Sequence, residues 1–190
     1  MGDNPVFEHE VQIWWPMADW KPAEIDTTDM TKSEAEKQQP IHPQLTVMVE
    51  MNKMHILAAV ETNGHLAGHP AEHIKKITGD LLIVLGEVFN NVLFHAHKGN
   101  PGKKLHLLWS IRNQILQMIF KDAGEGFDVD AILNYDSTCD ANIEIPDGRG
   151  LLLIRHFSQA EWSEGGTKIT VQKNLGMEPP PEPAAAAAAA

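Results

Sequence analysis

Cysteine is almost absent from this chain of 190 residues, which contains only Cys139. One cysteine cannot form an internal disulfide, so we expect a fold stabilised by a hydrophobic core in a reducing compartment such as the cytoplasm. Hydrophobic residues make up 43% of the sequence, enough for one well-buried domain. No uninterrupted apolar run approaches the ~20 residues that span a bilayer, and no signal peptide is recognisable. We therefore expect no membrane contact.

Positive charge is also scarce. Fifteen lysine and arginine residues stand against 26 acidic residues, and the formal net charge is −11. Sequence-independent binding to nucleic acid requires a basic face, so direct nucleic-acid contact is not expected. An acidic surface is instead compatible with a basic protein partner.

Three segments differ in composition. Residues 1–43 carry nine acidic and three basic side chains, five prolines and the tryptophans at 14, 15 and 20. This composition predicts an acidic arm that either packs on its own domain or docks a partner. Residues 44–175 are the predicted domain. Residues 176–190, rich in proline and then alanine, are predicted to be a disordered tail.

Apolar patterning predicts the elements of an α+β fold. Residues 45–51 are rich in β-formers and predict a strand, whereas residues 53–66 predict a helix. The proline-free segment 71–97 predicts a long central helix with a buried stripe at Leu81, Leu85, Val88 and Val92. The remaining predictions are strands at 105–111, 115–120 and 168–172 and a helix at 150–157. Helices segregated from consecutive strands indicate a two-layer α/β sandwich with a mixed, mostly antiparallel sheet.

Polar residues recur on the predicted central helix. Glu87, Asn91 and His95 are four residues apart, so they share one face, offset from the apolar stripe. The amide oxygen of Asn91 is a hard ligand of the kind Mg²⁺ prefers. The carboxylate of Glu87 could orient or deprotonate an attacking hydroxyl or water. An ordinary solvated helix face would show the same spacing.

Two glycine-rich turns complete the candidate chemistry. Asp122 follows a predicted strand and precedes Gly124 and Gly126; it could accept a hydrogen bond from an exocyclic amine such as that of adenine. Residues 148–150 open an apolar helix, where free N–H groups and the helix dipole favour a phosphate that Arg149 could also contact. Each turn alone also fits a plain glycine-rich turn or helix cap.

The four motifs, in this order, resemble those of the GHKL ATPases, the family of gyrase, heat-shock chaperone, histidine kinase and mismatch-repair ATPases. Glu87-Val88-Phe89-Asn90-Asn91, followed by His95, resembles the N-box. The run DAGEGF at 122–127 is similar to the first glycine box, GRGLLLI at 148–154 to the second, and Gly166-Thr167 to the last. The Gly-Arg-Gly-Leu run and compact size are most similar to the anti-sigma factor serine/threonine kinases. The resemblance covers residues 45–173.

This resemblance implies a role for each matched residue. Glu87 would be the general base and Asn91 the Mg²⁺ ligand. Residues 128–147 would form a lid over ATP. The residues implied to bind ATP are Asn91, His95, Asp122, Gly124, Gly126, Phe127, Gly148, Arg149, Gly150, Leu151 and Thr167.

The implied reaction is γ-phosphoryl transfer from ATP to a serine or threonine of an anti-sigma antagonist. The kinase would otherwise sequester a sigma factor, commonly as a homodimer. Two alternatives stay open. A non-catalytic module that binds nucleotide and sequesters a partner would have no use for Glu87. The ATP-binding domain of a histidine kinase would need an upstream helical hairpin, but residues 1–43 show no heptads and several prolines. A metal site at His65, His69 and His73 is not expected, because glycines and a proline interrupt that segment.

Overall fold

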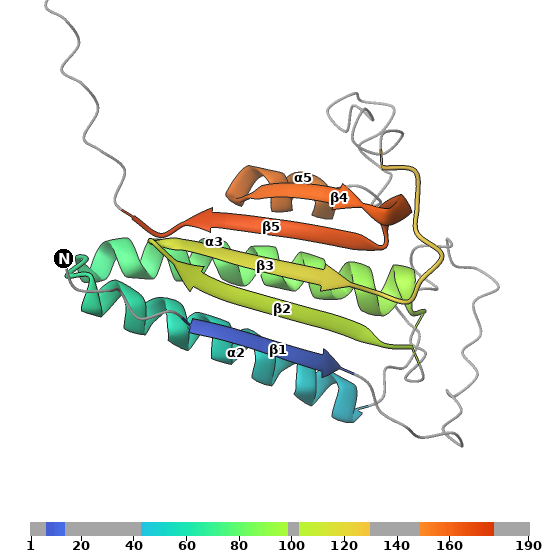
Figure 1. The fold of residues 1–190 in the computed structure, drawn as a ribbon, viewed down its shortest axis with the longest axis horizontal. Coiled ribbons are helices and arrows are strands. Elements are labelled where there is room, and N and C mark those ends of the chain that lie inside the picture. Colours follow the sequence, from blue (N-terminus) through green and yellow to red (C-terminus); the bar gives the residue numbers. More distant parts are fainter. Residues whose placement is uncertain (1–6, 14–42, 99–102, 130–148, 177–190) are drawn as a thin grey trace, which may run out of the picture.

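The computed structural model describes residues 7–13, 43–98, 103–129 and 149–176. Several predictions fall outside these ranges. They concern Gly148, residues 130–147 of the predicted lid with Cys139, the tryptophans of the N-terminal arm and residues 177–190. Figure 1 shows two layers, with a sheet on one side and helices on the other. The predicted α+β sandwich is confirmed.

Five strands form one sheet in the order β1-β2-β3-β5-β4. Every pairing among them is antiparallel. The strands are β1 (Phe7–Ile13), β2 (Leu105–Arg112), β3 (Ile115–Lys121), β4 (Gln159–Ser163) and β5 (Lys168–Asn174). The predicted strands at 105–111, 115–120 and 168–172 are confirmed. Residues 7–13, within the predicted arm, add the edge strand β1, and polar residues 159–163 add the opposite edge strand β4.

The helices lie on one face of this sheet (Figure 1). They are α2 (Pro43–Leu66), α3 (Ala71–Asn90) with its continuation η1 (Asn91–Ala96), and α5 (Arg149–Phe157). The predicted central helix and the helix at 150–157 are confirmed. Antiparallel strands joined by tight turns leave one sheet face for the helices to cover, and the core lies between the two layers.

The predicted strand at 45–51 is wrong, because these residues form the first turns of α2. In a strand, Leu45, Val47, Val49 and Met51 would share one face. Instead Leu45 and Val49 are 3% exposed, whereas Val47 and Met51 are 56% and 54% exposed. Burial therefore follows the helical repeat, since Val49 lies one turn after Leu45 and Ile56 lies two turns after Val49. Helix packing on the core overrides the local β-propensity of the valines.

Among the described residues, one helix, Ala71–Ala96, is long and apolar enough to cross a membrane by length and composition, with a mean hydropathy of 1.5. Most of its apolar side chains pack within the domain, whereas Leu82 and Ile83 are 54% and 40% exposed. The buried ones in α3 are Ile74, Ile77, Leu81, Val84, Leu85, Val88 and Phe89. Buried core helices can be as long and as apolar as a membrane-spanning helix. The polar residues Asp80 and Glu87 are seven residues apart, about two helical turns, so they share another face of the helix.

Candidate functional site

Glu87 and Asn91 lie where the central helix changes its hydrogen-bonding pattern. Helix α3 ends at Asn90, and Asn91–Ala96 continue as the π-helix η1. Short π-helical turns inside α-helices are rare and frequently occur at functional sites. Glu87 and Asn91 are half-buried, whereas His95 is exposed. His95 is therefore more accessible to solvent than the two residues with which it was predicted to share a face.

The start of α5 lies directly against these two side chains. A Cβ atom placed on Gly150 would lie 2.6 Å from Oε2 of Glu87 and 3.7 Å from Oδ1 of Asn91. Glycine therefore lets α5 approach the amide and the carboxylate this closely without displacing the carboxylate. The first N–H groups of a helix have no partner within it, and the dipole makes this end positive. The predicted meeting of the helix acid, the helix amide and the second glycine motif is present in the structure.

The residues on either side of Gly150 differ in their surroundings. Arg149 begins α5 and is exposed. Leu151, predicted to bind ATP, is 7% exposed and belongs to the hydrophobic core. Its side chain packs inside the domain, so only its backbone is left for contact with a ligand.

Asp122 follows β3, and its backbone and side chain are both fixed. Its N–H donates to the carbonyl of Thr167 at 2.9 Å, and its Oδ1 accepts from the N–H of Gly124 at 2.7 Å. Burial raises the pKa of the Asp122 carboxyl above its ordinary value, although the Gly124 hydrogen bond and the charge of Lys103 oppose this shift. A half-buried carboxyl held at the end of a strand is suited to accept a hydrogen bond from a buried amine.

The Asp122 turn is tied to the turn before β5. The N–H of Phe127 donates to the carbonyl of Gly165 at 2.9 Å. Gly126 adopts the left-handed region with φ of 76°, and a Cβ atom on it would overlap the carbonyl oxygen of Gly165. The same atom would lie 3.2 Å from Cγ2 of Thr167. The first and last glycine motifs therefore pack directly against each other.

The end of η1 packs against these turns, and η1 continues the helix that carries Glu87 and Asn91. A Cβ atom on Gly124 would lie 2.8 Å from Cβ of Ala96, so the Asp122 turn packs on the last residue of η1. Nε2 of His97 accepts from the N–H of Ala123 at 3.3 Å, which places the proton of the neutral ring on Nδ1. Lys103 donates to the carbonyl of Ala96 at 2.9 Å.

His97 was not predicted from the sequence to belong to the site. It is 3% exposed. Burial, followed by the charge of Lys103, lowers the pKa of His97 from 6.5 to about 4, and a hydrogen bond to the backbone of Lys104 partly opposes this. The ring is therefore neutral near pH 7 and acts as an acceptor that anchors the Asp122 turn. Its position two residues after the predicted N-box histidine was the only signal available in the sequence.

Among the residues that the structure describes, no three His, Cys, Asp or Glu side chains are grouped so that they could hold a metal ion. His69 and His73 make other contacts. Nε2 of His69 lies 3.0 Å from Oε1 of Gln114, and Nε2 of His73 lies 3.1 Å from the carbonyl oxygen of Leu175. Their rings join α3 and the turn before it to the β2–β3 turn and to the residue that follows β5.

Comparison with known protein families identifies residues 54–173 as a histidine kinase-like ATPase domain. The matched segment extends from the middle of α2 almost to the end of β5 and contains every motif of the candidate site. The match confirms the ATP-binding, GHKL type of domain that the motifs predicted. A search of curated protein sequences finds no match to the chain.

Proposed function

The chain belongs to the histidine kinase-like ATPase family, and from this premise we propose that it transfers the γ-phosphoryl group of ATP to a serine or threonine of another protein. The partner would be an anti-sigma antagonist, and the kinase would be a cytoplasmic anti-sigma factor that acts as a homodimer. ATP binding follows from the family. The acceptor and the partners rest on the Gly-Arg-Gly-Leu run at 148–151 and the compact size of the domain.

One observation carries the catalytic part of the proposal. The Glu87 carboxylate and the Asn91 amide both face the start of α5 at Gly150. The N-terminus of a helix favours phosphate. A carboxylate beside it repels that phosphate, so its presence weakens simple nucleotide binding. A carboxylate at this point is useful when it accepts a proton from an attacking hydroxyl, and this favours an enzyme over a non-catalytic nucleotide-binding module.

The side chains also fit a magnesium ion bound together with ATP. Asn91 presents an amide oxygen toward the start of α5, and such hard oxygen ligands suit Mg²⁺. Because the described residues include no protein cage of three acidic or histidine side chains, Asn91 would share the ion with phosphate oxygens and water. When bound, Mg²⁺ neutralises charge on the phosphate oxygens.

The rest of the proposed mechanism is performed by the chain's own residues. Asp122, fixed by the N–H of Gly124 and by its own bond to Thr167, would accept a hydrogen bond from the adenine amine. Arg149, exposed at the start of α5, would contact a phosphate. Glu87 would accept the proton of the attacking hydroxyl as its oxygen bonds to the γ-phosphorus and the bond from that phosphorus to the bridging oxygen breaks, which releases ADP.

A histidine kinase remains the second candidate, since the family takes its name from that domain. Its upstream element would be a helical hairpin with a phosphoacceptor histidine. In the described part of the region before α2, residues 7–13 form β1 of the sheet. Phosphohistidine is labile in acid, whereas phosphoserine and phosphothreonine are stable, so acid treatment of the labelled acceptor distinguishes the two functions.

The proposal is tested by Glu87→Ala, with Glu72→Ala as a matched control in the exposed first turn of the same helix. Proteins that co-purify from the native cell would be incubated with radiolabelled ATP and each variant. We expect Glu87→Ala to lower phosphoryl transfer by roughly 10²- to 10⁴-fold, with ATP affinity within about threefold of wild type because the phosphate cradle is intact. Unchanged turnover in Glu87→Ala, or no ATP binding by wild type, would show the proposed function to be wrong.

A further inference from the structure

Helices α3 and α5 lie side by side over an interval of equal length in each helix. Gly150 near the start of α5 lies against Glu87, and the last residue of α5 is Phe157. Phe157 lies seven residues beyond Gly150, and Asp80 lies seven residues before Glu87. At 1.5 Å per residue both intervals are about 10 Å. The two helices therefore run antiparallel, with Asp80 at the level of the end of α5.

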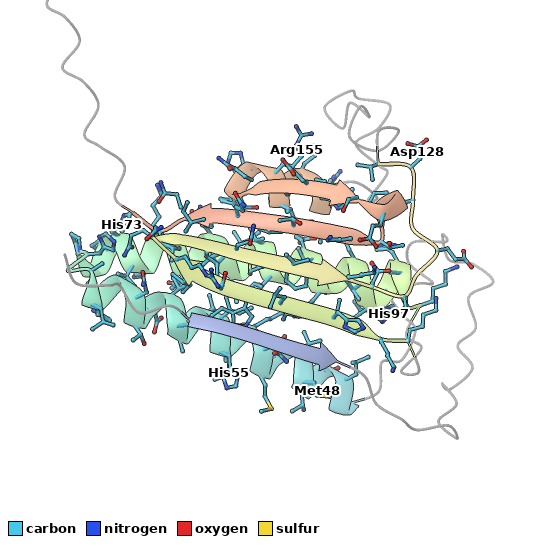
Figure 2. The ribbon with its side chains drawn as sticks, viewed as in Figure 1. Met48, His55, His73, His97, Asp128 and Arg155 are labelled. Carbon is cyan, nitrogen blue, oxygen red and sulfur yellow. The ribbon has the colours of Figure 1, made fainter. Side chains whose placement is uncertain are left out.

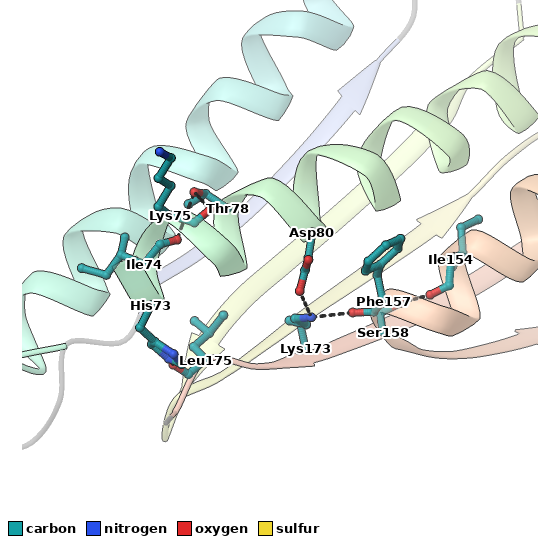
Figure 3. Close-up of polar contacts among 10 residues, drawn as sticks. All are labelled: His73, Ile74, Lys75, Thr78, Asp80, Ile154, Phe157, Ser158, Lys173 and Leu175. Atoms are coloured by element: carbon teal, nitrogen blue, oxygen red, sulfur yellow. Dashed lines mark hydrogen bonds and ion pairs between the residues drawn. The ribbon is translucent and has the colours of Figure 1, made fainter. Parts of the chain in front are cut away.

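Lys173 of β5 joins these two points. Its Nζ donates to Oδ2 of Asp80 at 2.8 Å and to the carbonyl oxygen of Phe157 at 2.7 Å, as Figure 3 shows. The side chains of Lys173 and Asp80 are 17% and 19% exposed, so both are largely removed from water. The last carbonyls of a helix have no partner within it, and a cation there also favours the negative end of the helix dipole.

We propose that Lys173, held by Asp80, is a positioning residue that fixes α5 along α3 and so sets the approach of Gly150 to Glu87. This inference rests on the proposed function, because it concerns the geometry of the same phosphate site. Lys173 acts through the position of α5 and touches no substrate.

Apolar contact alone leaves the position of α5 along its axis weakly defined. The helix has nine residues, a length that is marginal in isolation, and only Leu151 and Ile154 are buried. Apolar burial is not directional, so a small slide of α5 changes it little. Two short hydrogen bonds from one ammonium group are directional and are lost by the same slide. The polar contact therefore adds a directional restraint on the axial position to the packing of Leu151, Ile154 and Phe157 against the core.

Solvent reaches the ion pair from one side. A surface hollow is lined in part by His73, Lys76, Asp80, Lys173 and Asn174. Lys173→Met would leave the Asp80 carboxylate without its cation, and water entering from this hollow can solvate that charge, which limits the loss of overall stability. Loss of the pair should therefore alter the position and mobility of α5 more than the overall stability of the domain.

The test compares Lys173→Met with Lys75→Met, an exposed lysine on α3, and with the conservative Lys173→Arg. Backbone amide exchange is measured on the full-length protein without nucleotide. Affinities for ATP and for adenosine are then measured. We expect Lys173→Met to raise exchange in α5 about tenfold and to weaken ATP binding about tenfold, below the ~100-fold that a 1 Å misplacement can cost. Adenosine affinity should stay within about twofold, Lys173→Arg should recover most of both effects, and Lys75→Met should match wild type.

Unchanged exchange in α5 of Lys173→Met would overturn the inference, whatever the enzyme does. Equal loss of ATP and adenosine affinity, together with a lower melting temperature, would also overturn it, because Lys173 would then support the domain as a whole. If wild type bound no ATP, the proposed function would fail. The exchange measurement on the nucleotide-free protein would still decide whether Lys173 positions α5.

Discussion

The two ends of the α3–α5 pair are held together in different ways. Figure 2 shows His97 at one end of the domain and His73 at the other. At the His97 end, glycines bring backbones into contact with neighbouring side chains and carbonyls. At the His73 end, side chains make the connections, among them the Lys173–Asp80 pair. Between α3 and α5, the site end is thus sensitive to added volume and the far end to a lost polar group. The far end also has one close glycine contact, that of Gly64 in α2 with the Ile74 side chain.

Gly126→Ala should have the largest effect on stability. Gly126 has φ of 76°, and its Cβ atom would overlap the carbonyl oxygen of Gly165, which is backbone and cannot rotate away. We expect the free energy of unfolding to fall by about 3 kcal/mol, measured by urea denaturation, because conformational strain and overlap add. A loss below about 1 kcal/mol would mean that the site end tolerates added volume and would remove the contrast between the two ends.

Gly150→Ala should come next and should act on the rate. Its Cβ atom would meet Oε2 of Glu87, the far end of a flexible side chain. The carboxylate can rotate away, so the free energy of unfolding should change by less than about 1 kcal/mol. The displaced carboxylate should lower phosphoryl transfer about 100-fold, equivalent to about 2.7 kcal/mol.

A double variant sharpens this prediction. If the methyl group acts by displacing the carboxylate, adding Gly150→Ala to Glu87→Ala should lower the transfer rate no further than Glu87→Ala alone. Independent, multiplying losses would indicate that Gly150 contributes to the phosphate site in a way unrelated to Glu87.

Acidification should destabilise the site end through His97. Its pKa is about 4 in the folded protein, lowered from 6.5 by burial and by Lys103. Between pH 6.5 and about 4, His97 is therefore protonated in the unfolded chain and neutral in the folded protein. The contribution of His97 to stability is complete above pH 6.5 and is lost as the pH falls toward 4, by on the order of 2 kcal/mol.

Urea unfolding of wild type and His97→Gln at pH 7.5 and at pH 4.5 measures this contribution. Glutamine can still accept from the N–H of Ala123 but does not titrate. Asp122 has a raised pKa, so it changes stability in the opposite sense on acidification. Its effect cancels in the difference between the two proteins. Equal acid sensitivity of both would show that His97 is not the titrating group.

Much of the sheet and of the site could be predicted from the sequence, because local patterns determine them. Strands β2 and β3 alternate apolar residues, and the spacing of Glu87 and Asn91 places both on one helix face. The strand predicted at residues 45–51 was wrong because strand and helix patterns overlap over so short a run. Only packing on the core distinguishes the two structures. Strand β4 was missed because it has only five residues and follows α5 after a single residue, although its sequence Gln-Ala-Glu-Trp-Ser alternates polar and apolar residues.

Other features depend on contacts between distant residues and could not be predicted. Asp80 and Lys173 are 93 residues apart in the sequence, and each alone is an ordinary charged residue. The π-helical turn at Asn91–Ala96 and the buried ring of His97 also have no local signature. Motifs that contact a ligand follow short patterns, whereas the groups that position those motifs are defined only after folding.

Gly79→Ala should have the smallest effect, and its sign completes the comparison. Gly79 is exposed in α3 beside Asp80, and a Cβ atom on it would meet no other atom within 4 Å. Alanine in an exposed helix interior is favoured over glycine, so the free energy of unfolding should rise by about 0.5–1 kcal/mol with ATP affinity unchanged. The same substitution would thus stabilise the far end and damage the site end at Gly126. Destabilisation by Gly79→Ala would show that close packing extends over the whole helix, and the site end would then have no special requirement for glycine.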